Sequence, residues 1–310
     1  EIDGNSVTIP EGVTKICDEV FKENKNLKTV VFPSTLKSIG EQAFAECQSI
    51  TTIDLPEGIE RLEKACFYNC RKLSKVSIPD SLIEVGSSAF NSCSALTEIS
   101  LGNCVETVGE KAFLNCGMLR SIELSKNLKR ILPEAFSGCS VLNSIVLPDG
   151  LEEIGKEAFK NCASLESVII PSNVRKIESS TFSGCKLLMN VALPDGITEI
   201  ADSAFENCVE LTGITLPEVI GEQAFSGCIK LKEAVFVDGT KTISKNCFLR
   251  CDSLEEAIIP ESVETIQDGA FSGCTSLKKV ILPSALKSIG KSAFAGCHSL
   301  ESIVIPETVD

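Results

Sequence analysis

The chain has 310 residues, of which 43% are hydrophobic, and its formal net charge is −14. Because no basic cluster interrupts this negative charge, we expect neither nucleic acid nor an anionic membrane surface among its partners. The sequence contains neither a signal-like apolar run nor an apolar segment long enough to span a bilayer, so we expect no direct membrane insertion.

Phenylalanine recurs along the chain at a nearly constant interval of 23 residues, and only the step from Phe205 to Phe225 is shorter, at 20 residues. A fixed period of this size indicates that one small unit is copied and stacked. Since no linker interrupts the period, we predict a single solenoid domain over residues 1–310, with about 13 repeats and one shortened repeat near 206–225. The recurring residues are Phe21, Phe44, Phe67, Phe90, Phe113, Phe136, Phe159, Phe182, Phe205, Phe225, Phe248, Phe271 and Phe294.

Each unit predicts the same elements in the same order. It opens on a short strand, as at 168–170, where apolar residues two apart precede a proline that cannot continue the hydrogen-bond ladder. A turn follows, as at 148–150, and then a second short extended piece, as at 197–200. The unit closes on Ala-Phe-x-x-Cys-x-x-Leu, whose apolar spacing of three predicts one or two helical turns. We therefore predict a repeat α/β solenoid with parallel strands.

The combined pattern, Leu-x-x-Ile-x-Leu-Pro-x-x-Val-x-x-Ile-Gly-x-x-Ala-Phe-x-x-Cys, resembles the 23-residue leucine-rich repeat of the BspA-like family and covers essentially the whole chain. It differs from commoner leucine-rich repeats in having no Asn column after the strand. The resemblance implies a right-handed leucine-rich-repeat superhelix with a parallel concave sheet. It also implies a bacterial protein that is secreted or on the cell surface, serves adhesion and protein binding, and has no catalytic site. Any signal or anchor is expected to lie outside this chain.

Of the 16 cysteines, 12 occupy the column three residues after Phe, where the first copy has Asn24 instead. All members of the column should point the same way, whereas a disulfide needs two Cβ atoms aimed at each other. Small buried thiols also fill narrow internal corners well. We therefore favour free structural thiols over disulfides between neighbouring coils.

Two further cysteines, Cys66 and Cys247, replace the Ala before Phe and so lie four residues before Cys70 and Cys251. Such a pair could offer two metal ligands on one turn. A zinc site usually needs four nitrogen or sulfur ligands, however, and the only histidine, His298, is far from both pairs in the sequence. We therefore predict no metal site and no other cofactor.

No group of residues that breaks the repeat resembles an active site. His298 lies in a variable position and is expected on the surface, and the glycines recur at coil corners rather than in a phosphate-binding loop. The chain has no Trp and a single Tyr, Tyr68, so an aromatic platform for sugars is poorly supplied. We predict that the protein is not an enzyme.

The outward strand positions can be assigned unit by unit, and they change in character along the chain. Early units carry polar residues there, whereas later units carry aliphatic ones flanked by charges. A contiguous apolar stripe with a charged rim is typical of a protein-contact surface. The competing interpretation is that β-branched residues occupy exposed strand positions because they fit a pleated surface. The candidate contact stripe is Val235, Ile258, Ile281 and Val304, with Glu233, Glu256 and Lys279 beside it.

The shortened unit lacks three residues between Pro217 and Ile220. Turns absorb deletions well, so tolerated loop variation is one interpretation. The other is a local change of curvature, because the shape of a solenoid follows from small rotations between repeats.

These observations predict a non-catalytic scaffold that binds host matrix proteins or bacterial surface proteins through its concave face, and that self-associates weakly. One alternative is a structural spacer within a larger surface protein. A less favoured alternative is a solenoid enzyme acting on glycans, which would require a cluster of Asp, Arg and Lys on one sheet.

Overall fold

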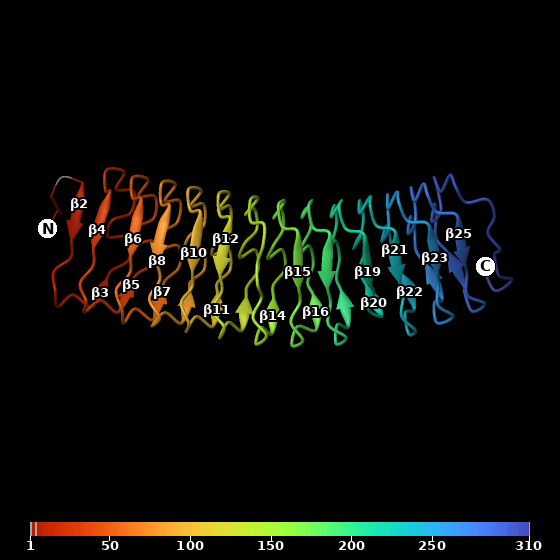
Figure 1. Cartoon of the computed structure of the whole chain (residues 1–310), viewed down its shortest axis with the longest axis horizontal. Helices are drawn as coiled ribbons and strands as arrows, with labels where there is room; N and C mark the ends of the chain where they lie inside the picture. The colour runs from red at the N-terminus through yellow and green to blue at the C-terminus, as the bar shows by residue number, and fades with distance from the viewer. Residues whose placement is uncertain (1, 4, 310) are drawn as a thin grey trace. The chain divides into compact units, whose positions relative to one another are not determined.

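The computed structural model describes residues 2–3 and 5–309, and every regular element in this part of the chain is a short β-strand. The chain divides into two compact units, Glu1–Ser164 and Leu165–Asp310. Both units are stacks of similar coils, in which strands of neighbouring coils lie side by side (Figure 1). A typical coil contains a three-residue strand, a turn, a two-residue strand and a longer run of turns around Phe, and the segments 144–146 and 302–304 have no assigned strand.

The first unit contains two sets of parallel strands. The two-residue strands join into one seven-stranded sheet, ordered β14-β13-β11-β9-β7-β5-β3, and the three-residue strands pair as β2-β4, β6-β8 and β10-β12. The three-residue strands are β2 (Ser6–Thr8), β4 (Thr29–Val31), β6 (Thr52–Asp54), β8 (Lys75–Ser77), β10 (Glu98–Ser100) and β12 (Ser121–Glu123). The two-residue strands are β3 (Lys15–Ile16), β5 (Ser38–Ile39), β7 (Arg61–Leu62), β9 (Glu84–Val85), β11 (Thr107–Val108), β13 (Arg130–Ile131) and β14 (Glu153–Ile154).

One strand of this unit departs from the repeat. The strand β1 (Ile2–Asp3) pairs antiparallel with β2, so Ile2 faces Val7 in the register. Every other pair of strands in the described residues is parallel. The antiparallel strand occupies the ladder edge of β2 opposite β4, so both edges of β2 are paired.

The second unit repeats the arrangement. Its two-residue strands form the sheets β16-β18-β20 and β22-β24-β26, and its three-residue strands pair as β15-β17, β19-β21 and β23-β25. The three-residue strands are β15 (Ser167–Ile169), β17 (Asn190–Ala192), β19 (Gly213–Thr215), β21 (Glu233–Val235), β23 (Glu256–Ile258) and β25 (Lys279–Ile281). The two-residue strands are β16 (Lys176–Ile177), β18 (Glu199–Ile200), β20 (Val219–Ile220), β22 (Thr242–Ile243), β24 (Thr265–Ile266) and β26 (Ser288–Ile289).

The recurring phenylalanines form a stacked spine inside each unit. Neighbouring rings lie 5.1 to 5.6 Å apart between centroids in the first unit and are nearly parallel, and the second unit shows the same stacking. Interior members such as Phe113 are fully buried. Two further phenylalanines, Phe32 and Phe236, come from inward strand positions and meet the spine edge-on, at Phe44 and Phe248. Stacked and edge-on rings are both favourable arrangements of aromatic pairs.

The predicted helical turns around Phe are wrong, because no helix occurs in residues 2–3 and 5–309. A helix would keep these N–H groups within its own coil. Here the N–H groups alternate instead: Phe44 donates to the carbonyl of Cys66 in the next coil at 2.8 Å, whereas Ala45 donates to Gln42 in its own coil at 3.0 Å. Gln42 and Glu46 have positive φ angles of 53° and 60°, which a helix does not tolerate. An apolar spacing of three fits these successive turns as well as it fits a helix.

A sequence signal for these turns exists in the residue immediately before the column cysteine. Positive φ at the third residue of a four-residue turn favours Gly or Asn. Nine of the thirteen residues at this position are Gly or Asn, and all nine have positive φ: Asn69, Asn115, Asn161, Asn207, Gly138, Gly184, Gly227, Gly273 and Gly296.

The shortened coil of the second unit keeps its register. Strand β20 pairs with β18, so Ile220 lies opposite Ile200 although the coil has lost three residues. The loss falls in the turn after Pro217, beside a hollow of about 650 Å³ that Pro194 and Asp238 also line. The deletion therefore alters the turn and leaves the strands and the spine in place.

Candidate binding surface

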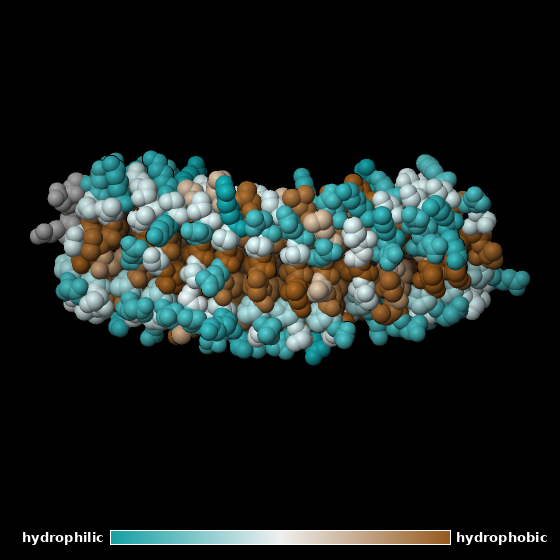
Figure 2. All heavy atoms as spheres, viewed as in Figure 1, coloured by the Kyte–Doolittle hydropathy of each residue, from teal (hydrophilic) through white to brown (hydrophobic). Residues whose placement is uncertain are grey.

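The strand face is the solvent side of the three-residue strands and of the equivalent segments 144–146 and 302–304. In these strands the middle residue points into the core and the outer two point to solvent, as the two-residue period of a strand requires. Strand β23 is typical: Glu256 and Ile258 are exposed and Ala257 is buried. Figure 2 shows apolar side chains gathered in a band across the coils, with polar side chains on both sides of it.

The four aliphatic residues of the predicted contact stripe all lie on the strand face of the second unit. Their exposed fractions are 54% for Val235, 60% for Ile258, 44% for Ile281 and 83% for Val304. Ile258 and Ile281 are register partners across β23 and β25. Val235 ends β21, and Val304 lies in the last coil, in a segment without assigned strand. The structure thus pairs Ile258 with Ile281 and leaves all four aliphatic side chains exposed.

The charged residues beside the stripe also lie on the strand face. The carboxylate of Glu256 is 4.0 Å from the ammonium of Lys279, and both side chains are more than half exposed. One position earlier in the same two coils, Glu255 accepts a hydrogen bond from Lys278 at 2.8 Å. This contact lowers the pKa of Glu255 and raises that of Lys278. Exposed pairs of this kind contribute little to stability, so their charges are available to a partner.

A groove of about 580 Å³ adjoins the stripe between β21 and β23, and the sequence did not predict it. It is lined by Val235 and Ile258 of the stripe, by Ala234 and Phe236, and by four charged residues, Lys232, Glu233, Glu255 and Glu256. The middle strand residue is Val or Ile in the other coils but Ala234 and Ala257 in these two. Two alanines at this position in successive coils therefore indicate, from the sequence, that less side-chain volume lies beneath this part of the sheet.

The cysteine column binds the coils together through backbone contacts. Column thiols donate a hydrogen bond from Sγ to the carbonyl of Phe in the preceding coil, as Cys93 does to Phe67 at 3.2 Å. In the first copy, where Asn24 takes the place of the cysteine, its Oδ1 accepts hydrogen bonds from the backbone N–H groups of Asn26 and Leu27. The same thiol contact recurs at Cys47, Cys70, Cys116, Cys139, Cys162, Cys208, Cys228, Cys251, Cys274 and Cys297.

Burial makes these thiols weak acids and therefore poor nucleophiles. It raises the pKa of Cys47 to about 11 and that of Cys228 to about 12. The pKa values of Cys66 and Cys247 are also raised by burial. None of the sixteen cysteines forms a disulfide, and within residues 2–3 and 5–309 no group of three or more His, Cys, Asp or Glu side chains could hold a metal ion.

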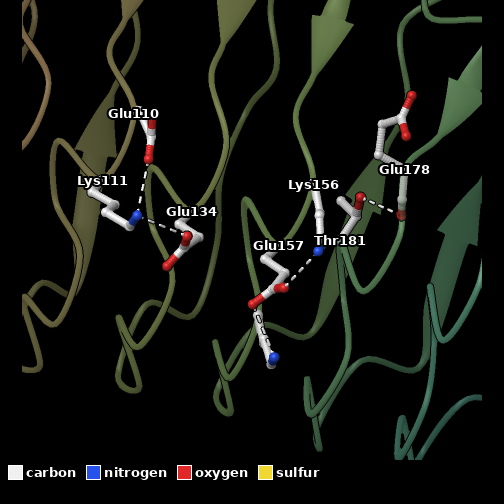
Figure 3. A network of polar contacts seen from close by, with 8 residues as sticks. Glu110, Lys111, Glu134, Lys156, Glu157, Glu178 and Thr181 are labelled. Carbon is white, nitrogen blue, oxygen red and sulfur yellow. Dashed lines mark hydrogen bonds and ion pairs between the residues drawn. The ribbon is translucent and has the colours of Figure 1, made fainter.

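A different edge of the coils, at the Phe turns, carries exposed ion pairs in the first unit (Figure 3). The ammonium of Lys111 lies between Glu110 at 2.9 Å and Glu134 at 3.1 Å, and Glu157 accepts a hydrogen bond from Lys160 at 2.9 Å. That bond lowers the pKa of Glu157. Of these pairs, Lys111–Glu134 links the turns of two neighbouring coils, and the others lie within one coil. His298 is likewise an exposed residue of the last coil.

The described part of the chain contains no helix that is long and apolar enough to cross a membrane. The parallel coils, the Phe spine and the exposed strand face together define a leucine-rich-repeat solenoid.

The family model for the BspA type leucine rich repeat region matches residues 3–120, 106–220 and 218–310, so the chain belongs to this family. A comparison with curated proteins gives no match. Among solved structures, a leucine-rich repeat protein from Bacteroides ovatus is 28% identical, with a TM-score of 0.78 over 98% of this chain and 87% of that one.

Two further structures share the fold at lower identity. A leucine rich cell surface protein from Faecalibacterium prausnitzii is 24% identical, with a TM-score of 0.56, and the match covers 96% of this chain and 86% of that one. The pneumococcal vaccine antigen PcpA is 21% identical, with a TM-score of 0.60, over 90% of this chain and 79% of that one.

Proposed function

We propose that this chain is a non-catalytic scaffold, secreted or displayed on a bacterial cell, that binds host matrix proteins or bacterial surface proteins through the strand face of its second unit. The family is one of repeat scaffolds, and leucine-rich repeats generally mediate protein interactions. The cell-surface description of the Faecalibacterium protein and the vaccine use of the pneumococcal one support a location outside the cell.

The observation that carries the proposal is the contact stripe itself. Four aliphatic side chains on successive coils are each at least 44% exposed. Two of them, Val235 and Ile258, line a groove of about 580 Å³. A bound protein would cover this apolar surface, while Glu233, Glu256 and Lys279 remain at the edge to set orientation. An apolar centre with a polar rim is the usual anatomy of a protein interface.

The test is a pull-down from a host matrix extract and from a bacterial surface extract, using the double variant Ile258→Asp, Ile281→Asp. We expect the variant to lose the captured partner, because two carboxylates would have to be buried unpaired in the interface. Its thermal unfolding should be unchanged, since both residues face solvent.

A matched control is the double variant Val31→Asp, Ile169→Asp, which introduces the same two carboxylates at exposed strand-face positions outside the stripe. We expect this variant to bind as the parent does. If the double variant captures the same protein equally well, the stripe is not the contact surface. If nothing is captured by the parent chain from either extract, the structural-spacer alternative is favoured.

A further inference from the structure

The first unit has a groove of about 880 Å³ where the strands β8, β10 and β12 run into the turns that follow them. Residues 146–150 of the next coil form its far side. The groove therefore crosses four successive coils. At a spacing of about 4.8 Å between neighbouring strands, it extends roughly 14 Å across the coils.

The groove exists because two neighbouring coils lack the proline that usually follows the strand. Pro79 and Pro148 occupy this position in the outer two coils, whereas Gly102 and Ser125 occupy it in the inner two. Gly102 has a φ of +59°, which the proline ring forbids. Without the two rings, the surface between the outer prolines is hollow.

The walls of the groove hold their polar groups in place through contacts between coils. Asp80 accepts hydrogen bonds on Oδ1 from the backbone N–H of Asn103 at 2.9 Å and from its side-chain amide at 3.1 Å. Glu123 accepts one from the hydroxyl of Ser100 at 2.9 Å. With Asp149, three carboxylates line the groove against a single ammonium, that of Lys126.

The groove also offers apolar surface beside these charges. Val146 is 83% exposed, and the half-buried Leu124 lies in the same lining. No aromatic side chain lines the groove, so it lacks the flat platform on which sugar rings stack. The combination fits a ligand with positive charges and short aliphatic groups rather than a neutral carbohydrate.

We propose that this groove binds an extended polypeptide segment carrying Lys or Arg beside aliphatic side chains. Guanidinium and ammonium groups form charge-assisted hydrogen bonds with carboxylates, and the excess of negative charge attracts them before contact. About five residues of an extended chain, at roughly 3.3 Å each, span the four coils. This site belongs to the first unit and does not rest on the contact stripe of the second.

The test measures fluorescence anisotropy of a labelled heptapeptide, Gly-Arg-Val-Thr-Val-Arg-Gly, titrated with the full chain at low and at moderate salt. We expect saturable binding that weakens as salt rises, because the attraction is partly electrostatic. The same peptide with Glu in place of Arg should not bind. Equal binding of the two peptides would overturn the proposal.

The triple variant Asp80→Asn, Glu123→Gln, Asp149→Asn should bind the Arg peptide at least about tenfold more weakly, which is the effect of losing roughly one charged contact. A matched variant, Glu23→Gln, Glu41→Gln, Glu46→Gln, removes the same charge from residues outside the groove and should bind as the parent does. If both triple variants weaken binding equally, only net charge attracts the peptide and the groove is not the site.

Val146→Thr is a second variant that keeps the shape of the side chain and all the charges. We expect this variant to bind the Arg peptide about threefold more weakly, because it loses an apolar contact of this size. Thermal unfolding of each variant verifies the fold. An unchanged affinity in Val146→Thr would contradict the predicted apolar contact, and saturable binding of a glucosamine oligomer in place of the peptide would assign the groove to a cationic glycan.

Discussion

The Sγ atom of Cys228 donates a hydrogen bond to the carbonyl oxygen of Phe205 at 3.1 Å, although only 23 residues separate the two. Elsewhere the same contact spans 26 residues, as from Cys251 to Phe225. The rings of Phe205 and Phe225 still stack, 5.5 Å apart between centroids. The coil has therefore lost three residues from its turn while keeping both internal columns, which separates the parts that hold the coils together from the parts that vary.

Replacing an interior spine residue should be costly, whereas the same change at the first coil should cost less. Phe113→Ala removes a fully buried ring that stacks on both neighbours, so we expect a loss of about 3–5 kcal/mol in the free energy of unfolding. Phe21 is half-buried and stacks on Phe44 from one side of the spine. Denaturant unfolding of both variants, with hydrogen exchange to locate the loosened coils, measures the difference, and equal losses would contradict it.

The buried thiols should make the fold sensitive to alkali. In the folded chain burial raises the pKa of Cys228 from 9.0 to about 12, so this thiol stays protonated where an unfolded one ionises. Because the unfolded state then binds fewer protons, stability is full below about pH 9 and falls as the pH rises toward 12. Each such thiol lowers the free energy of unfolding by about 1.4 kcal/mol per pH unit in this window.

The measurement is denaturant unfolding at a series of pH values from neutral into this range. Cys228→Ala should reduce the slope with pH by about 1.4 kcal/mol per unit, since it removes one titrating group. Leu231→Ala, also fully buried, is the control: it should lower stability at every pH without changing the slope. A Cys228→Ala slope equal to that of the parent would show that the thiol ionises alike in both states.

Thiol accessibility in the folded chain should divide the cysteines sharply. Cys17 and Cys104 are exposed, Cys297 is intermediate, and the other members are buried. A coloured disulfide reagent should therefore react at once with Cys17 and Cys104, more slowly with Cys297, and with the rest only on unfolding. The double variant Cys17→Ser, Cys104→Ser should lose the fast phase. A fast phase that persists in it would mean that the coils open readily.

The periodic features of the structure could be predicted from the sequence because each is repeated many times. The Phe column predicted a stacked interior, and the alternation around Ile258 placed its neighbours inside and outside the strand. The functional role of the stripe stays a prediction. The family assignment from the repeat pattern is confirmed by the family match.

The features that could not be predicted depend on single residues or on hydrogen bonds between coils. The spacing of Phe, Cys and Leu fits helical and non-helical turns equally, and only the bonds from one coil to the next decide between them. The groove of the first unit depends on Gly102 and Ser125 in adjacent coils. A consensus of the repeats shows proline at this position and therefore hides these two exceptions. The antiparallel strand β1 lies outside the repeated unit and so has no periodic signal at all.

The left-handed turn positions offer a direct test of the backbone interpretation. Ser88 has a φ of 57° and lies two residues before Phe90, where a Cβ atom is unfavourable. Ser88→Gly should stabilise the fold by about 1 kcal/mol, because the strain of a side chain at positive φ exceeds the added entropy of Gly in the unfolded state.

The reverse change should act in the opposite direction. Gly138 has a φ of 75°, and a Cβ atom there would lie 2.5 Å from Oδ1 of Asn115, so Gly138→Ala should destabilise the fold by about 1–2 kcal/mol. Denaturant midpoints of the two variants and the parent measure both effects. A helical turn at these positions would reverse both signs, since Gly weakens a helix and Ala favours one.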